Sequence, residues 1–258
     1  MRREPAGDFD YEAAGSGYAE VRRPEPRFAA AVRRALGEAR TLVNVGAGAG
    51  SYEPADMEVT PVEPSAGMRS QRPPWLAPAV DATAEDLPFP DGAFDAALAS
   101  VTIHQWRDLG RGLAEVRRVT KGPVVILTFD PVALHRFWLT EYAPDVMAHE
   151  CGRMPPLGPV VDALGGSSTI EELPIPSDCS DGFAEAFFGR PEALLVERVR
   201  RAQSAWGFVG RAAEQRAVDR LARALDTGEW DAAHGGLRSA DEYHGALRLV
   251  TAHPAPGG

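Results

Sequence analysis

The stretch Val43-Asn44-Val45-Gly46-Ala47-Gly48-Ala49-Gly50 says more about the fold than any other part of this sequence. A short apolar run enters a turn that has glycine at every second position, Gly46, Gly48 and Gly50. Glycine permits a tight turn directly after a strand and lets backbone amides approach a bound ligand closely. The pattern is G-x-G-x-G, whereas the dinucleotide fingerprint G-x-G-x-x-G would need glycine in place of Ser51. The turn therefore predicts a ligand site and disfavours a nicotinamide-dependent oxidoreductase.

An acidic residue follows the next predicted strand, Glu58–Val62. Glu63 lies thirteen residues beyond Gly50, in the sequence Val62-Glu63-Pro64-Ser65. A carboxylate at the tip of the second strand can accept hydrogen bonds from both hydroxyls of a ribose, its usual task in nucleoside-binding sheets. A solvated loop acid or a cap for a following helix is the alternative. Because the glycine turn precedes it, we expect Glu63 to hold a ribose.

Short aliphatic runs alternate with helical patterns along the first half of the chain, and the second half is less regular. Strands that alternate with helices predict a parallel sheet covered on both faces. Asp108 is placed to cap one of the helices. The predicted strands are Thr41–Val45, Glu58–Val62, 94–100, Val124–Phe129, 169–175 and 247–252, and the predicted helices are 27–39, 108–120 and much of 181–223.

Composition narrows the class of protein. The chain has 258 residues, with 37 acidic and 27 basic side chains and a formal net charge of −10, which disfavours nucleic acid as a partner. Two cysteines, Cys151 and Cys179, are too few for a disulfide scaffold and predict unpaired thiols. The N-terminal sequence never reaches an apolar stretch and no window is long enough to span a membrane. We therefore expect a cytoplasmic protein without a membrane partner.

Two further stretches complete a series of four motifs. Residues 81–95 read DATAEDLPFPDGAFD, and residues 113–122 read LAEVRRVTKG. With the glycine turn and Glu63, they occur in the order typical of class I S-adenosylmethionine-dependent methyltransferases. The first half of the chain resembles this family, and within it the small-molecule group (methyltransferase type 11) of ubiquinone and menaquinone biosynthesis enzymes. The resemblance implies S-adenosyl-L-methionine as cofactor and S-adenosyl-L-homocysteine as its product.

The resemblance also implies the architecture. We expect an α/β fold with a Rossmann-like, mostly parallel seven-stranded sheet, helices on both faces and a helical cap. Residues 1–258 are expected to form a single methyltransferase domain. Within it, residues 1–40 would form N-terminal lid helices, 41–130 the cofactor-binding core, 131–240 a cap and substrate region with a sixth strand, and 241–258 the last strand and tail.

The roles of individual cofactor-binding residues follow from the resemblance as well. Asp81, Thr83 and the backbone of Ala84 fall where the family contacts adenine. This segment has two extra residues, so its alignment with the family's adenine-binding loop can shift by two positions. Ser100 and Val101 fall under the methionyl part and the methyl group. Asn44 stands where the family usually has an acid, and the turn that follows leaves room for only a stunted helix. The implied cofactor-binding residues are Tyr18, Arg23, Asn44, Gly46, Ala47, Gly48, Gly50, Glu63, Pro64, Met68, Asp81, Thr83, Ala84, Ser100 and Val101.

The chemistry needs a positioned acceptor and, where the acceptor carries a proton, a base. His104 follows the predicted strand 94–100, at the edge of the sheet where ligands bind, and its ordinary pKa suits proton removal at neutral pH. A structural or substrate-positioning histidine is the alternative. Trp106, Trp138 and Tyr142 are expected to line an acceptor pocket, although aromatic residues at helical spacing also form ordinary core. No metal site is expected.

The predicted function is methyl transfer to a small-molecule acceptor, such as a specialised metabolite, by a monomer or homodimer. The alternative is a methyltransferase-like fold that binds the cofactor or nothing and acts as a non-methylating enzyme or regulatory module. Asn44 and the short turn are its main support. A nucleic-acid methyltransferase is disfavoured, because residues 100–103 lack the proline-proline-aromatic motif and Pro73-Pro74-Trp75 precedes the third predicted strand.

Overall fold

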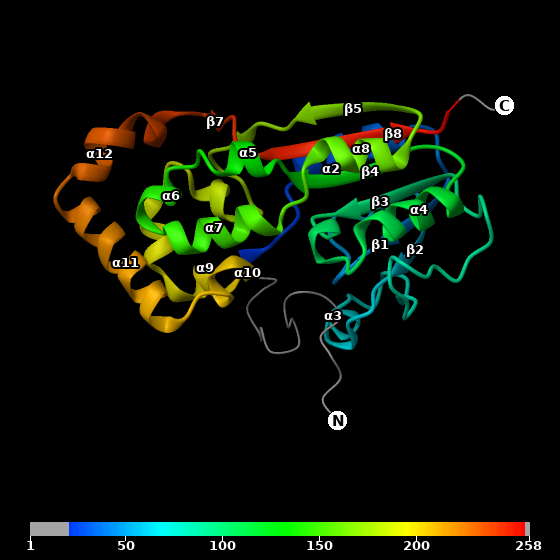
Figure 1. Ribbon diagram of the computed structural model, residues 1–258, viewed down its shortest axis with the longest axis horizontal. Helices are drawn as coiled ribbons and strands as arrows, with labels where there is room; N and C mark the ends of the chain where they lie inside the picture. Colours follow the sequence, from blue (N-terminus) through cyan, green and yellow to red (C-terminus); the bar gives the residue numbers. More distant parts are fainter. Residues whose placement is uncertain (1–20, 256–258) are drawn as a thin grey trace.

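The protein is an α/β fold in which a mostly parallel sheet carries helices on both faces and a helical cap at one end (Figure 1). The computed structural model describes residues 21–255. The central sheet of these residues has six strands in the order β2-β1-β3-β4-β8-β5. The strands are β1 (Thr41–Val45), β2 (Glu58–Val62), β3 (Ala96–Ser100), β4 (Val124–Phe129), β5 (Ser167–Glu172) and β8 (Leu247–His253).

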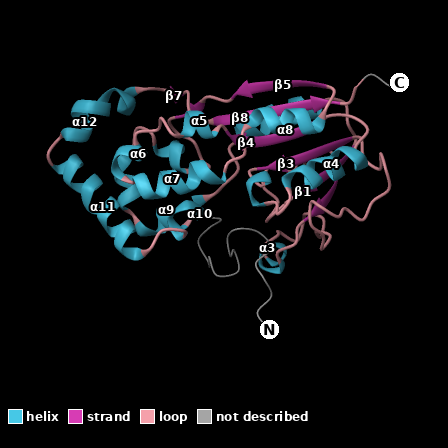
Figure 2. Cartoon of the chain, in the orientation of Figure 1, coloured by secondary structure: helices cyan, strands magenta, loops and turns pink. Residues whose placement is uncertain are grey.

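Alternation of apolar side chains along the strands explains why both faces are covered. In β4, Val125 and Leu127 join one buried cluster, whereas Val124 and Ile126 join the other. Successive side chains of a strand point to opposite faces, so a continuous apolar strand requires cover on each side. The helix α2 (Pro26–Leu36) covers one face, and α4 (Leu109–Val119) and α8 (Leu157–Leu164) cover the other (Figure 2).

The topology places a crevice at the carboxyl ends of β1 and β3. β1 pairs in parallel with β2 on one side and with β3 on the other. The strand order therefore reverses at β1: the chain goes from β1 to β2 on one side and then returns to β3 on the other side. β8 is antiparallel to β4 and to β5. In open α/β sheets, ligands bind outside the carboxyl ends of the strands where the strand order reverses. The glycine turn after β1 lies at this point.

The prediction of seven strands is wrong by one for the sheet of residues 21–255. A further strand beyond β2 is reduced to a single parallel bridge between Val62 and Val80. The amide of Val80 donates to the carbonyl of Pro61 at 2.8 Å, and its own carbonyl accepts from the amide of Glu63 at 3.0 Å. Pro78 and its neighbours Pro73 and Pro74 have no amide hydrogen to continue such a ladder.

Several predicted boundaries also shift. The helix predicted over 27–39 ends at Leu36, where Gly37 adopts φ +61°. The strand predicted over 94–100 begins at Ala96, because Phe94 pairs only through a bridge to Thr120. The strand predicted over 169–175 is divided between β5 and β6 (Ile175–Pro176), and β6 forms a separate two-stranded sheet with β7 (Glu242–Tyr243). Asp108 caps α4 as expected.

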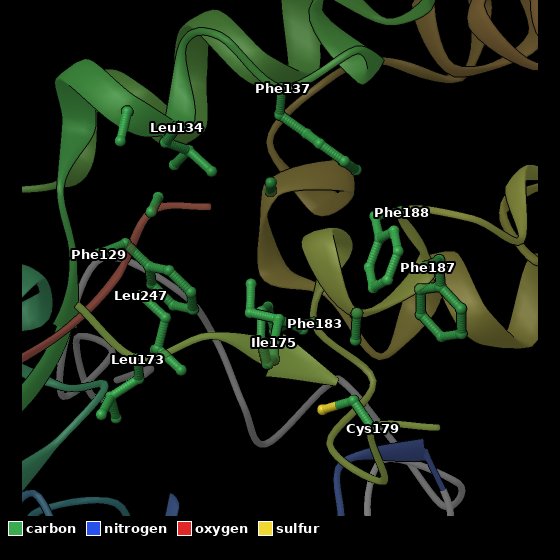
Figure 3. Close-up of a cluster of buried hydrophobic side chains, with 14 of the residues drawn as sticks. Phe129, Leu134, Phe137, Leu173, Ile175, Cys179, Phe183, Phe187, Phe188 and Leu247 are labelled. Carbon is green, nitrogen blue, oxygen red and sulfur yellow. The ribbon is translucent and has the colours of Figure 1, made fainter. Parts of the chain in front are cut away.

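The cap consists of short helices beside the carboxyl edge of the sheet (Figure 1). An apolar cluster joins it to the strands: Phe129 at the end of β4 and Leu247 at the start of β8 face Phe183 and Ile175 (Figure 3). The rings of Phe129 and Phe183 lie 5.2 Å apart. The cap helices are α5 (Pro131–Leu134), α6 (Leu139–Tyr142), α7 (Pro144–Arg153), α9 (Glu197–Arg201), α10 (Ser204–Gly207), α11 (Arg211–Asp226) and α12 (Glu229–His234), with the 3-10 turns η2 (Ala184–Phe187), η3 (Pro191–Leu195) and η4 (Gly235–Ser239).

Trp230 is the largest fully buried side chain of the cap and packs edge-on against Trp138 at 5.4 Å. Replacement by alanine should lower the free energy of unfolding by about 3–5 kcal/mol, because it removes buried contacts and leaves a cavity. Trp230→Phe should cost much less, since its indole N–H has no partner among the described residues. Urea unfolding of both variants measures the difference. Trp75→Ala, at an 80% exposed position, is the control, and an equal loss in all three would contradict the assignment of Trp230 to the core.

Candidate functional site

A large cavity lies between the carboxyl edge of the sheet and the cap. It encloses about 1310 Å³ of space not filled by protein atoms, a volume that includes the open mouth. One wall comes from the ends of β1, β2 and β3, and the opposite wall from the cap. The sheet wall contains Asn44, Gly46, Ala47, Gly48, Ala49, Ser51, Tyr52, Glu63, Met68, Ser100, Val101, Thr102, His104 and Gln105.

The glycine turn requires glycine at its first position. Gly46 adopts φ +74°, and a Cβ on it would lie 2.1 Å from Oγ1 of Thr102, which follows β3. The amides of Gly46 and Ala47 both donate to the carbonyl of Val62 at 2.9 Å, so the turn is fixed against β2 as well. Gly48 has φ +52° and lines the cavity. The turn thus joins the ends of three strands at the cavity wall.

Glu63 is 7% exposed and is held by backbone amides. One carboxylate oxygen accepts from the amide of Gly48 at 2.8 Å, and the other accepts from the amide of Ser65 at 2.8 Å. Burial raises the pKa of Glu63, although the two amides and the nearby Arg69 and Arg72 act in the opposite direction. The carboxylate therefore faces the cavity with its orientation fixed by the chain on both sides.

Asn44 is 1% exposed and lines the cavity beneath the turn. Its amide nitrogen donates to Glu53 at 3.0 Å, and Glu53 forms a buried ion pair with Arg72 at 2.9 Å. Its oxygen, Oδ1, is buried without a hydrogen-bond partner among the described residues. Asn44 replaces the acidic residue usual in the family, but sequence reasoning did not identify Glu53 as its hydrogen-bond partner. The carboxylate of Glu53 lies behind the amide, nine residues later in the chain.

The end of β3 is strained where it meets the cavity. Val101 has φ +51°, a left-handed conformation that is unfavourable for a β-branched residue. Ser100, Val101 and Thr102 all line the cavity, and Thr102 is the residue pressed against Gly46. Strain of this kind persists only where the surroundings enforce it, and it is frequent at functional sites.

His104 lies in the short 3-10 turn η1 (Ile103–Gln105) and lines the cavity. Burial is the main cause that lowers the pKa of His104 to about 3, and the positive charges of Arg153 and Arg22 act in the same direction. Its Nδ1 is buried without a hydrogen-bond partner among residues 21–255. The ordinary pKa that the sequence analysis assumed is therefore wrong for this environment. The imidazole is neutral at pH 7 and can accept or donate one hydrogen bond.

A buried polar cluster closes one side of the cavity. Arg22 and Asp181 form an ion pair at 2.5 Å, and the hydroxyl of Tyr52 donates to the other oxygen of Asp181 at 2.8 Å. The same hydroxyl accepts from the amide of Glu25 at 3.2 Å. Arg22, Tyr52 and Asp181 line the cavity, whereas the predicted Arg23 is exposed and does not. Tyr18 lies outside the described residues.

Several other predicted residues lie away from the cavity wall. Asp81 pairs with Arg69 at 2.9 Å. Trp106 packs over Gly112 of α4, and Trp138 and Tyr142 lie in the core of the cap, where the indole of Trp138 donates to the carbonyl of Phe188 at 2.9 Å. The predicted residues that do not line the cavity are Arg23, Gly50, Pro64, Asp81, Thr83, Ala84, Trp106, Trp138 and Tyr142.

Sequence reasoning missed almost the whole cap wall. These residues come from four separate segments and have no motif in common, so only the folded chain brings them together. Asp181, Glu185 and Gln203 are buried polar residues of this wall, and Glu185 is 0% exposed. The buried Trp206 has an indole N–H without a partner among the described residues. The cap wall contains Phe129, Leu134, Leu139, Val146, Met147, Glu150, Asp181, Phe183, Ala184, Glu185, Gln203, Ser204, Ala205 and Trp206.

Residues 21–255 contain neither a membrane-spanning helix nor a metal-binding group of side chains. No helix in this range is both long and apolar enough to span a bilayer. No three His, Cys, Asp or Glu side chains come together there in a group that could hold a metal ion. Cys151 and Cys179 are both free thiols, as the cysteine count predicted.

The low pKa of His104 can be measured without knowing any ligand. Its imidazole resonances should stay constant from pH 8 down to about pH 5, because the neutral form persists until the pH approaches a pKa of about 3. Exposed His244 is the internal control: its hydrogen bond to the carboxylate of Glu172 raises its pKa, so its resonances should titrate at a higher pH than those of His104. Nuclear magnetic resonance spectra, with His104→Gln for assignment, measure both. A His104 midpoint between pH 6 and 7 would contradict its burial.

Comparison with known proteins adds to this geometry. A family model described as a methyltransferase domain matches residues 43–127, which include the glycine turn, Glu63 and β3. A protein of Anabaena variabilis ATCC 29413, provisionally assigned as a methyltransferase of an antibiotic biosynthesis pathway, has a similar structure. It is 28% identical, with a TM-score of 0.83 over 90% of this chain and 99% of that one.

Two further similarities are more limited. The protein YafE of Escherichia coli (strain K12), which is uncharacterized, is 47% identical over 38 residues, and these span 15% of this chain and 18% of that protein. The [4+2]-cyclase SpnF shares the fold alone, at 16% identity and a TM-score of 0.53 over 90% of this chain and 81% of that one. The residues that match the family model include the glycine turn that lines the cavity, and the Anabaena structure has a similar overall fold. Residues 43–127 therefore belong to a methyltransferase domain.

Proposed function

We propose that this protein transfers the methyl group of S-adenosylmethionine to a small molecule held between the sheet and the cap. The observation that carries the proposal is a single cavity with two unlike walls. The sheet wall offers the backbone of the glycine turn and the fixed carboxylate of Glu63, which suit a nucleoside. The cap wall is mainly apolar and suits a second, less polar molecule.

The cofactor fits the sheet wall on structural grounds. Glu63 can accept hydrogen bonds from ribose hydroxyls while the amides of Gly48 and Ser65 hold its carboxylate in place. The unpartnered oxygen of Asn44 can accept from an ammonium group, such as that of the methionyl part. When bound, the cofactor supplies an electrophilic methyl group on a sulfonium. The other predicted cofactor contacts remain proposals.

The residues of the cavity act mainly by positioning the acceptor and the cofactor relative to each other. Ser100, Val101 and Thr102 line the cavity at the end of β3, where they can contact the bound cofactor or acceptor. Neutral His104 can orient an acceptor hydroxyl or amine through one hydrogen bond, and its low pKa makes it a poor store for a proton. The apolar cap excludes water from the reacting atoms. Holding two molecules in reacting geometry can by itself supply much of a rate enhancement.

A small acceptor fits the cavity between the sheet and the cap. The net charge of −10 also disfavours a polyanion such as nucleic acid as the acceptor. The Anabaena protein that this structure resembles is assigned to an antibiotic biosynthesis pathway, which favours a specialised metabolite as acceptor. The second candidate is a non-methylating enzyme or regulatory module on the same fold. SpnF, a cyclase, shows that a similar fold occurs with another reaction. Asn44 in place of an acid is the feature of this chain that favours the second candidate.

Calorimetric titration of the whole chain with S-adenosylmethionine, S-adenosylhomocysteine and NADH tests the proposal. Both sulfur compounds should bind at one site per chain, and NADH should not, because the third glycine of the dinucleotide fingerprint is Ser51. A screen with labelled methyl donor then separates transfer from mere binding. Binding of NADH alone would overturn the proposal, and cofactor binding without transfer to any acceptor would favour the second candidate.

Glu63→Ala tests the location of the ribose. Loss of a charged hydrogen-bond acceptor should weaken S-adenosylhomocysteine binding by about 1–3 kcal/mol, which is roughly a fivefold to hundredfold rise in Kd. Glu58→Ala, at an exposed position at the other end of β2, is the control and should leave the Kd unchanged. Calorimetry measures both, and thermal unfolding shows whether the glycine turn has survived. An unchanged affinity in folded Glu63→Ala would mean that the ribose lies elsewhere.

A further inference from the structure

Glu185 is a fully buried carboxylate at the cavity wall, in the 3-10 turn η2 of the cap. Its two oxygens accept from a single amide, that of Ala246, at 3.1 and 2.9 Å. No ion pair joins it to a positively charged side chain within residues 21–255. A buried carboxylate without a cation is costly, because its lost hydration is not replaced. Burial raises the pKa of Glu185 to about 7 and Glu172 acts in the same direction, whereas the amide of Ala246 and the charge of Arg248, which forms no ion pair with Glu185, act in the opposite direction.

The other three carboxylates at the cavity each have more partners than Glu185, either an ion pair or two separate backbone amides. Glu63 accepts from two separate backbone amides. Asp181 pairs with Arg22 and also accepts from Tyr52. Glu150 pairs with Arg153 at 2.9 Å. Glu185 is the exception among the cavity carboxylates of the described chain, so it is the one that a positively charged ligand would stabilise most.

The cap wall that contains Glu185 has one buried donor without a hydrogen-bond partner among the described residues. Trp206 is 5% exposed, lines the cavity, and has an indole N–H without a partner among the described residues. A buried donor of this kind is expected to meet an acceptor when the site is filled. Apolar residues make up most of this wall, beside the polar Gln203 and Ser204; they include Phe129, Leu134, Leu139, Val146, Met147 and Phe183.

We propose that the cap half of the cavity is the acceptor site and that it binds a small, mainly apolar amine whose ammonium group is received by Glu185. This inference rests on the proposed function and names its substrate class. The ammonium replaces the missing cation, and the apolar body lies against the cap wall. An oxygen on the ligand meets the indole N–H of Trp206. A carboxylate ligand is rejected, because it would place a second negative charge beside Glu185.

Three probes with the same apolar body and different head groups test the proposal. The whole chain, saturated with S-adenosylhomocysteine, is titrated at pH 8 with 2-phenylethylamine, 2-phenylethanol and phenylacetate. The amine should bind about tenfold or more tighter than the alcohol, in line with the strength of a charged hydrogen bond. Phenylacetate should bind weakest. This comparison uses the unmodified protein and does not depend on any variant folding.

A matched pair of variants then assigns the effect to one residue. In Glu185→Gln the preference for the amine over the alcohol should disappear, while S-adenosylhomocysteine binds as before. Glu197→Gln, which removes an exposed carboxylate of α9, should keep the full preference. The glutamine oxygen can still accept from the amide of Ala246, so we expect the variant to fold.

Each outcome separates this inference from the function it rests on. Failure of the unmodified protein to bind S-adenosylhomocysteine would overturn the proposed function. If the cofactor product binds but the amine does not bind, or binds no tighter than the alcohol, the assignment of an amine is wrong. An amine preference that survives in Glu185→Gln would place the ammonium group at another residue and overturn the role of Glu185.

Discussion

The ends of β1 and β3 can meet only because residue 46 has no side chain. A Cβ on Gly46 would overlap Oγ1 of Thr102, and its φ of +74° is unfavourable for other residues. This close approach brings the glycine turn against the end of β3, and two amide bonds to Val62 bring it against β2. Three strand ends therefore face the same space. Glu63 faces it too, because its carboxylate binds the turn through Gly48.

The cap depends on the same turn through Tyr52. This residue follows the glycines, has φ +63°, and buries its hydroxyl between Asp181 of the cap and the amide of Glu25 ahead of α2. The desolvated hydroxyl beside the carboxylate of Asp181 has its pKa raised strongly, so it stays a donor at all ordinary pH values. Because no helix follows β1 before β2, the chain is free to present Tyr52 to the cap. The short segment after β1 is thus a polar attachment of the cap, in addition to the apolar cluster at Phe129 and Phe183.

Local patterns explain why the sheet wall could be predicted and the cap wall could not. The glycine turn, Glu63 and the end of β3 are each encoded within a few residues, and a strand followed by glycines has few alternatives. Trp138 was expected to line the acceptor pocket, with ordinary core as the alternative. It packs in the core against Trp230, which is 92 residues away in the sequence and so is not part of any local pattern. The pKa of His104 depends on burial and on Arg153, which no local pattern shows. The seventh strand is reduced to the bridge at Val80, next to Pro78. In a segment that already contains Pro73 and Pro74, Pro78 alone did not indicate that the strand would be lost.

The two walls of the cavity differ in how they handle charge, and this difference assigns their roles. On the sheet wall, backbone amides hold Glu63 before any ligand arrives, so the site is organised in advance for a ligand of fixed shape. On the cap wall, within residues 21–255, the indole N–H of Trp206 has no partner and the carboxylate of Glu185 accepts only from the amide of Ala246. Polar groups left in this state gain most from a ligand that completes them and reject one that does not. Selectivity for the acceptor is therefore expected to arise in the cap, from residues that share no sequence motif.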